Sequence, residues 1–230
     1  MIRPLRRAWM VPLLRRSVRT QLRRGLAGVW VRGQPPAGGA VLAPNHPSWW
    51  DGYLLAELAW QQAQPVRVMM DTAQLATFPF LSLLGARSPG DLRALARDAR
   101  TGAWVIVFPE GEIRPAGRPG DLHGGAGWLA RTSGAPLCPV ALRVMVRAAP
   151  TPEAFVRFGA PCRPAELPAR LQALVEAQDA ELAQARPDQP PAGYLCRVRG
   201  QSARPDQDTL PVRLLRRLGG WADPHGTMKP

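Results

Sequence analysis

The chain has 230 residues, of which 46% are apolar, so it is long enough for one domain with a sizeable core and is not disordered throughout. It carries 30 Lys+Arg against 17 Asp+Glu, a formal net charge of +13 at pH 7, and every basic residue except Lys229 is arginine. Its three cysteines and three histidines lack the spacing of a disulfide framework or a zinc site, so we expect no metal and no cofactor.

A basic amphipathic segment opens the chain. The first 32 residues hold nine arginines, and the first acidic residue is Asp51. Apolar residues recur between the arginines at steps of mostly three to four: Leu5, Trp9, Leu13, Leu14, Val18, Leu22 and Leu26. Such a helix is typical of a membrane interface, where each cation near an anionic leaflet contributes roughly 1 kcal/mol. We therefore expect residues 1–32 to form a membrane-interface helix; the alternative is a helix packed on its own domain with a solvated Arg face.

Strands and helices alternate over residues 33–185. Apolar runs predict strands at 40–43, 66–70, 104–108, 137–144 and 154–158. Helical patterns cover 53–62, 73–84, 88–100, 127–133 and 168–185. This alternation predicts an α/β fold with a central, mostly parallel sheet flanked by helices.

Residues 186–230 differ in composition. Pro, Asp, Gln and Gly dominate to about Asp208, and a short basic apolar stretch follows at 210–218. We expect a Pro/Gly-rich, basic, loosely packed tail in which 210–218 forms a second membrane-contacting helix. The sequence has no apolar run of the roughly 18 residues that a transmembrane helix needs, and its N-terminus lacks the features of a secretory signal.

The strongest local motif is Asn45-His46-Pro47-Ser48-Trp49-Trp50-Asp51, between a predicted strand and a predicted helix. Residues five apart within a helix do not share a face. Pro47, however, moves His46 out of the helical region and itself suits a first helical turn. Asp51 can then reach back to one imidazole nitrogen and leave the other free to take a proton from a hydroxyl. The alternative is a capping histidine beside an ordinary first-turn aspartate.

Two further motifs carry charge. Phe108-Pro109-Glu110-Gly111-Glu112-Ile113-Arg114 follows a predicted buried strand, and ligands of parallel sheets bind beyond the strand ends. Gly85-Ala86-Arg87 precedes a predicted helix, where an Arg could help bind an anion; a solvated Arg is the alternative.

In this order and spacing, these motifs together with Pro139-Val140-Ala141-Leu142 resemble the glycerolipid acyltransferase family, in its lysophosphatidic-acid acyltransferase-like group. The resemblance covers about residues 40–145. It implies that 33–185 is an acyltransferase catalytic domain, with His46 and Asp51 as the catalytic pair. Substrate binding is assigned to Asn45, Ser48, Arg87, Glu110, Gly111, Glu112 and Arg114.

The resemblance implies acyl transfer from acyl-CoA or acyl-carrier protein to a hydroxyl of a lyso-lipid such as 1-acylglycerol-3-phosphate, in phospholipid biosynthesis. The expected partners are therefore an acyl donor, a lyso-lipid acceptor and an anionic membrane surface, with no nucleic acid. The expected location is peripheral or monotopic on the cytoplasmic face of the cell membrane.

The sequence departs from the family at one position. Family members usually carry Thr and then Arg after the Glu-Gly pair, whereas Glu112 and Ile113 stand here and the Arg comes at 114. Because Glu112 would repel a phosphate dianion, a glycolipid, a glycosylated carotenoid or a lyso-amino-acid lipid is the alternative acceptor. Two other functions remain open: a membrane-bound thioesterase or esterase that uses the same pair on water, and a nucleic-acid-binding protein.

Overall fold

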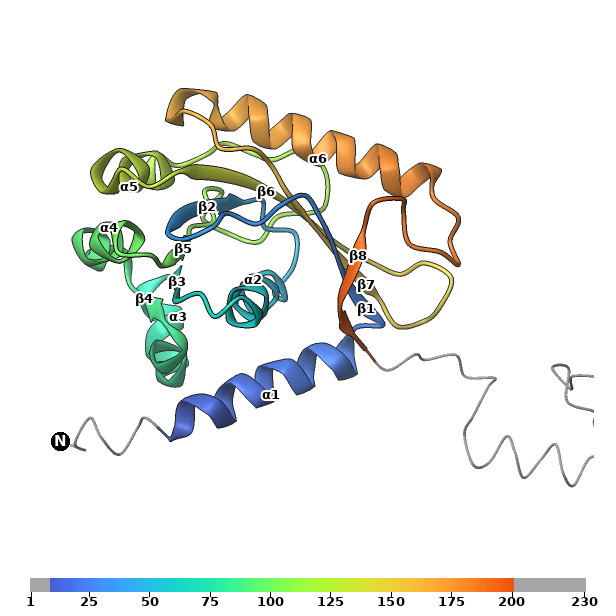
Figure 1. Ribbon diagram of the computed structural model, residues 1–230, viewed down its shortest axis with the longest axis horizontal. Coiled ribbons are helices and arrows are strands. Elements are labelled where there is room, and N and C mark those ends of the chain that lie inside the picture. Colours follow the sequence, from blue (N-terminus) through green and yellow to red (C-terminus); the bar gives the residue numbers. More distant parts are fainter. Residues whose placement is uncertain (1–8, 201–230) are drawn as a thin grey trace, which may run out of the picture.

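The computed structural model describes residues 9–200. They form three layers, in which one sheet lies between two layers of helices (Figure 1). The sheet has eight strands in the order β4-β3-β5-β2-β6-β7-β1-β8 (Figure 1). The strands are β1 Gly28–Arg32, β2 Ala40–Pro44, β3 Val66–Met69, β4 Ala86–Arg87, β5 Trp104–Ile106, β6 Leu137–Met145, β7 Glu153–Phe158 and β8 Leu195–Arg199. Neighbours pair in parallel except β6 with β7 and β1 with β8, which confirms the predicted mostly parallel α/β sheet.

The five strands from β4 to β6 all run in the same direction, so their carboxyl ends lie along one edge of the sheet. The three residues of β5 are completely buried, because helices cover both faces of the sheet at this point. The segments that carry His46, Glu110 and Arg87 therefore leave the sheet along the same edge.

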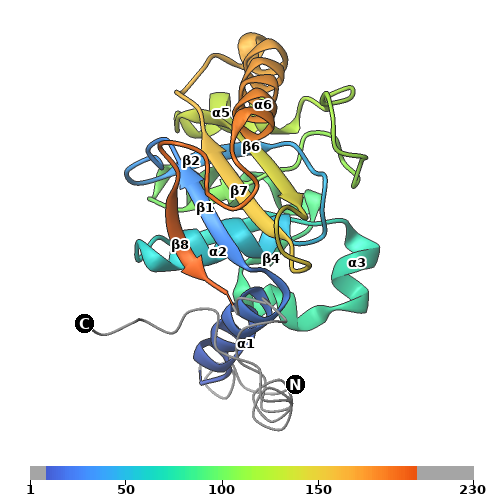
Figure 2. The same ribbon diagram turned by 90° about the vertical axis from the view of Figure 1, so that its right-hand side faces the viewer.

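Helices cover the two faces of the sheet. The helices are α1 Met10–Gly25, α2 Asp51–Gln61, α3 Thr72–Thr77, α4 Leu92–Arg100, α5 Gly125–Ser133 and α6 Leu167–Gln184, with 3-10 turns η2 Pro79–Leu84, η3 Pro89–Asp91 and η4 Pro164–Glu166. In both views α2 lies between the sheet and α1, while α6 lies on the opposite side (Figures 1 and 2). The core divides accordingly: one buried cluster joins α1 and α2 to the sheet, and others join α4, α5 and α6 to its opposite face.

The N-terminal helix differs from the expectation for 1–32. It ends at Gly25, and residues 28–32 form β1 inside the sheet. Gly25 is required at this end because a Cβ there would lie 2.4 Å from Cη2 of Trp50. The apolar stripe is also divided, because Val18, Leu22 and Leu26 are buried in the core whereas Trp9 and Leu13 are 64% and 56% exposed. The internal packing that the sequence left as the alternative thus holds for the second half of the stripe.

The segment after 186 is better packed than expected as far as residue 200. Leu195–Arg199 forms β8, which pairs antiparallel with β1 and places Val198 in the core. The helix predicted at 210–218 lies outside the described residues. Within residues 9–200, none of the helices has the length and apolarity needed to cross a membrane.

Two smaller differences occur along the sheet edge. Ala86–Arg87 forms the short edge strand β4, and the helix predicted from residue 88 starts as the 3-10 turn η3 before α4. The helical stretch predicted at 73–84 with a break at Pro79 does divide there into α3 and η2, because proline lacks the amide hydrogen that would continue an α-helix, but its second part is a 3-10 turn.

Candidate active site

His46 and Asp51 are in direct contact. Nδ1 of His46 lies 2.9 Å from Oδ2 of Asp51, and the Ser48 amide donates to the same oxygen at 2.9 Å. Because an ionised carboxylate only accepts hydrogen bonds, Nδ1 carries the hydrogen and Nε2 is left as the basic nitrogen. The segment from Pro47 to Trp50 makes this contact possible: the chain turns after His46 and α2 begins at Asp51, whose amide donates to the Ser48 carbonyl.

Asp51 is completely buried at the first turn of α2. Burial raises the pKa of its carboxyl, because desolvation penalises the charged form, and this effect exceeds the opposing hydrogen bonds from His46 and Ser48 and the positive charges of His46 and Arg143. The second carboxylate oxygen, Oδ1, is buried without a hydrogen-bond partner among residues 9–200. The surroundings of Asp51 therefore favour its contact with His46. When its carboxyl is charged, however, its burial lowers the stability of the folded protein.

The imidazole of His46 lies at the surface of the sheet edge. Its ring stacks on Phe108, with centroids 3.9 Å apart and an interplanar angle of 21°. The side chain is 17% exposed, and Nε2 makes no hydrogen bond within residues 9–200. The ring is thus fixed in orientation by Asp51 and Phe108, with its basic nitrogen free to meet a substrate proton.

Glu110 is buried and anchors two loops. Oε1 accepts the His46 amide at 3.0 Å, and Oε2 accepts the Gly120 amide at 3.0 Å. The carbonyl of His46 accepts in turn from the Arg114 amide at 2.9 Å. Both backbone polar groups of His46 are therefore bound by the segment that follows β5. Glu110, which the resemblance assigns to substrate binding, thus supports the backbone of the histidine.

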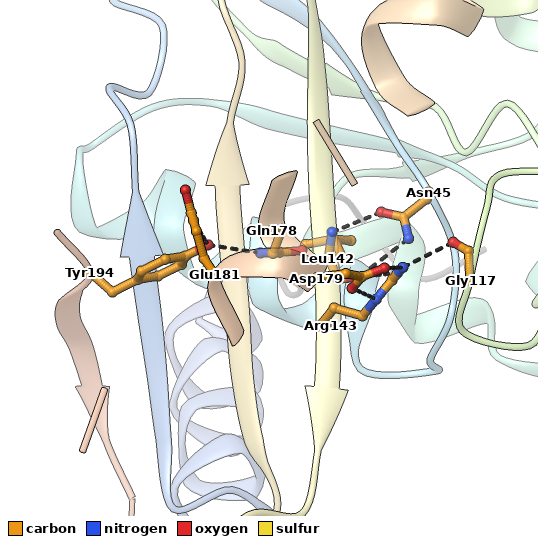
Figure 3. A network of polar contacts seen from close by, with 8 residues as sticks. All are labelled: Asn45, Gly117, Leu142, Arg143, Gln178, Asp179, Glu181 and Tyr194. Carbon is orange, nitrogen blue, oxygen red and sulfur yellow. Dashed lines mark hydrogen bonds and ion pairs between the residues drawn. The ribbon is translucent and has the colours of Figure 1, made fainter. Parts of the chain in front are cut away.

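Asn45 also bonds to the protein itself. Its Nδ2 donates to the Leu142 carbonyl at 3.2 Å, and its Oδ1 accepts the Leu142 amide at 2.7 Å (Figure 3). The buried side chain thus continues the pairing of β2 with β6 by one residue and sets the point at which the chain leaves the sheet. Ser48 also bonds to the protein itself: its Oγ accepts the Trp50 amide at 3.0 Å and so stabilises the turn that precedes α2.

The loop after Glu110 is exposed. Gly111 adopts a φ of 75°, which favours glycine, and a Cβ there would lie 3.1 Å from the His123 ring. Glu112 and Arg114 form an exposed ion pair, with Nη2 and Oε1 2.8 Å apart. These three predicted residues are the ones that the structure leaves accessible beside His46.

Arg87 ends β4 at the same edge of the sheet, three strands from β2. At the usual strand spacing this separation is roughly 14 Å. Its Nη1 donates to the Ala86 carbonyl at 3.4 Å, and no carboxylate within residues 9–200 pairs with it. A partly buried guanidinium with no counter-ion among these residues is suited to an anionic ligand.

Two residues of this region were not predicted from the sequence. Phe108 was part of a motif, but its stacking on His46 requires β5 to lie beside β2. Arg143 lies outside the sequence motifs, although a single arginine in the apolar run that forms β6 is a visible signal, and the structure shows that it is buried.

The fold and this site define an α/β enzyme with a His–Asp pair at the carboxyl edge of its parallel strands. The sequence matches the Acyltransferase family model over residues 29–143, which is half of the chain. The chain therefore belongs to the acyltransferase family, and its reaction takes an acyl donor and an acceptor.

A solved structure shares this fold. The 1-acyl-sn-glycerophosphate (LPA) acyltransferase PlsC from Thermotoga maritima superposes with a TM-score of 0.53 at 19% sequence identity, over 81% of this chain and 85% of that one. At this identity the similarity establishes the common architecture.

Proposed function

We propose that the chain transfers a fatty acyl group from acyl-CoA or acyl-carrier protein to a hydroxyl of a lyso-lipid such as 1-acylglycerol-3-phosphate. His46 is the general base and Asp51 orients it. The observation that carries the proposal is the 2.9 Å contact between Nδ1 and Oδ2, with Nε2 free at an accessible edge. The Thermotoga maritima protein of the same fold is an LPA acyltransferase, which agrees with this assignment.

The reaction follows from that geometry. Nε2 of His46 removes the proton of the acceptor hydroxyl while the oxygen of that hydroxyl attacks the thioester carbonyl of the acyl donor. The new C–O bond forms, the C–S bond breaks, and the proton passes to the leaving thiolate. Asp51 stabilises the transient imidazolium. Within residues 9–200 the Oγ of Ser48 accepts the Trp50 amide and has no hydrogen bond to the imidazole of His46, which supports direct transfer in place of an acyl-serine intermediate.

Membrane association is part of the proposal, on the cytoplasmic face and without a spanning segment. Trp9 and Leu13 are exposed on the first half of α1, and Arg16 and Arg24 are exposed without ion pairs to residues 9–200. The exposed Phe78 and Phe80 flank the start of η2, which contacts α1. Apolar side chains beside unpaired cations suit an anionic lipid surface.

The first test is acyl transfer by the purified protein. Labelled acyl-CoA would be supplied with lyso-lipids and glycolipids, and the product identified by mass spectrometry. His46→Ala should lower the rate by about 10²–10⁴ and leave the circular dichroism spectrum unchanged. A near-normal rate in this variant, with chemistry limiting, would contradict the assigned role. Thioester hydrolysis independent of every acceptor would favour an esterase.

One observation favours a second class of acceptor, namely a glycolipid, a glycosylated carotenoid or a lyso-amino-acid lipid. Arg114 pairs with Glu112, so its charge is already compensated where a phosphate would bind. A dianion would also meet the Glu112 carboxylate. Arg87 is then the predicted cation that remains for a phosphate. An uncharged sugar hydroxyl suits the loop with Glu112 and Arg114 better than a phosphate does.

Glu112→Gln tests the two acceptor classes against each other. Removing the carboxylate should raise kcat/KM for a phosphate acceptor relative to a glycolipid by roughly two- to fivefold, the effect of an exposed ion pair. Glu166→Gln is the matched control, because Glu166 forms an exposed pair with Arg163 away from the site. An unchanged ratio in Glu112→Gln would show that Glu112 does not select the acceptor.

A further inference from the structure

Arg143 is a buried cation in the second half of β6. Its Nε and Nη2 bind the two carboxylate oxygens of Asp179 on α6 at 2.6 and 2.7 Å. Its remaining bonds go to backbone carbonyls: Nη1 to Leu142 at 3.0 Å and Nη2 to Gly117 at 2.9 Å (Figure 3). Asp179 is 44% exposed, so an ion pair with it could form at the surface of the protein. The ion pair by itself therefore does not account for the burial of Arg143.

Both carbonyls lead to the proposed active site. The Leu142 carbonyl also accepts from Nδ2 of Asn45, the residue before His46. Gly117 belongs to the segment 111–120, which is also held by the Arg114 amide on the His46 carbonyl, by the Gly120 amide on Glu110 and by an exposed ion pair between Arg118 and Glu176 of α6. One guanidinium therefore holds the loop that follows Glu110 to β6, next to the carbonyl that anchors the turn carrying His46.

The charge of Arg143 also acts on Asp51. The two charged groups that favour the ionised form of this carboxyl are His46 and Arg143, and both lower its pKa against the larger effect of burial. Oδ1 of Asp51 has no hydrogen-bond partner among residues 9–200, and the charge of Arg143 is one of the interactions that offset the burial of this carboxyl.

We propose that Arg143 is a positioning residue of this active site: its guanidinium fastens loop 111–120 to β6 beside the carbonyl that anchors Asn45, and its positive charge favours the ionised form of Asp51 that orients His46. The proposal rests on the proposed role of His46 as general base. It assigns no contact between Arg143 and substrate.

Two substitutions separate the charge from the hydrogen bonds. Arg143→Gln removes the charge, so Asp51 takes up a proton more readily and the acid limb of the pH profile of kcat/KM should move up by roughly 0.5–1 pH unit. Arg143→Lys keeps the charge and should restore the limb to within about 0.2 unit. Neither side chain can hold Asp179 and both carbonyls together, so both variants should raise the KM for the acceptor by about tenfold.

Hydrogen exchange tests the tether without depending on activity. Amides of 111–120 should exchange about ten times faster in Arg143→Gln and Arg143→Lys than in the wild type. Asp179→Asn leaves the contacts toward the site, so it should keep the wild-type acid limb and the slow exchange of this loop. Arg67→Gln is the matched control, because Arg67 pairs with Asp98 at 2.6 Å and with the carbonyl of the preceding residue, without a bond to the site loops.

The outcomes are separable. Absence of acyl transfer in the wild type would contradict the proposed function, and the exchange measurement would still decide the tether. An active wild type whose acid limb is superimposable with that of Arg143→Gln would overturn the electrostatic role. If Asp179→Asn or Arg67→Gln matched Arg143→Gln in exchange and pH profile, Arg143 would be merely a packing residue. If Arg143→Gln fails to fold, hydrogen exchange of residues 111–120 is compared between Arg143→Lys, in which the loop is expected to be released, and Asp179→Asn, in which it is expected to stay held.

Discussion

Asp51 shows how a single residue serves function at a cost to stability. Its carboxyl is buried, one of its oxygens has no partner among residues 9–200, and its pKa is raised by desolvation. A carboxylate kept charged in this position opposes folding, yet it fixes the hydrogen of His46 on Nδ1 because an ionised carboxylate can only accept a hydrogen bond. The same burial that makes the residue costly makes its contact with the imidazole well defined.

Asp51→Asn is expected to lose activity and gain stability. The amide can donate to Nδ1 and select the wrong tautomer, so kcat should fall severely. Because the folded-state pKa of Asp51 lies above its unfolded value of 3.8, the wild type loses stability as the pH rises through that folded-state value. The Tm of the variant minus that of the wild type should therefore become more positive as the pH rises from about 4 towards the folded-state pKa of Asp51. Calorimetry across this range measures the trend, and a difference that shrinks would contradict the sign.

Asn45 and Glu110 make a second point about single residues. Both belong to motifs predicted to bind substrate, and both direct all of their side-chain hydrogen bonds within residues 9–200 to backbone groups that hold His46 in place. A short polar motif at a strand end can thus fix the backbone of the residue that is proposed to act as base.

At the scale of elements, α1 has two roles along its length. Leu22 and Val18 are buried against α2 and the sheet, and Arg19 forms an ion pair with the buried Glu57 at 2.7 Å. Trp9 and Leu13, in the preceding turns, are exposed. A single apolar stripe therefore packs on the domain at one end and is available to a membrane at the other.

Substitutions in the two halves of α1 should separate stability from membrane binding. Leu22→Ala should lower the free energy of unfolding by about 2–5 kcal/mol, because it empties a completely buried position. Trp9→Ser with Leu13→Ser should leave the Tm unchanged and lower the fraction bound to anionic vesicles. Denaturant titration and vesicle sedimentation measure the two effects. Loss of vesicle binding in folded Leu22→Ala, with no loss in the double variant, would reverse the assignment.

At the scale of the whole molecule, the net charge of +13 permits both lipid and nucleic acid as partners. Several arginines of α1 are committed to the domain: Arg19 to Glu57, Arg23 to the Arg199 carbonyl, and Arg15 to the face of Trp60. The exposed cations that remain on this helix lie on the same element as Trp9 and Leu13. This combination favours a lipid surface over a phosphate backbone.

Partitioning compares the two partners directly. At equal ionic strength the protein should prefer anionic vesicles to duplex DNA, because only the vesicles accept its exposed apolar side chains. Binding to vesicles of uncharged lipid should be weaker, and added salt should reduce binding to the anionic ones. Preference for DNA at every salt concentration would refute the membrane assignment.

Local patterns in the sequence were sufficient for much of this protein. Continuous apolar runs predicted β5 and β6, helical periodicity predicted α2 and α6, and Pro47 explained how His46 and Asp51 could meet. In each case the determining interaction, an apolar period or a turn, is contained within a few consecutive residues. The resemblance to the acyltransferase family rests on the same contiguous motifs.

The tertiary structure decided what depends on distant partners. The sequence pattern did not predict β1, at the end of a helical pattern, or β8, in a Pro-rich tail. β1 becomes a strand because it pairs with both β7 and β8, and β8 becomes one because it pairs with β1. Asn45 meets Leu142 across 97 positions and Glu110 meets His46 across 64, so their anchoring roles have no local signature. The division of the α1 stripe and the placement of Arg143 have the same origin. Burial and pairing between distant segments are properties of the assembled sheet, whereas periodicity and turn chemistry belong to the chain.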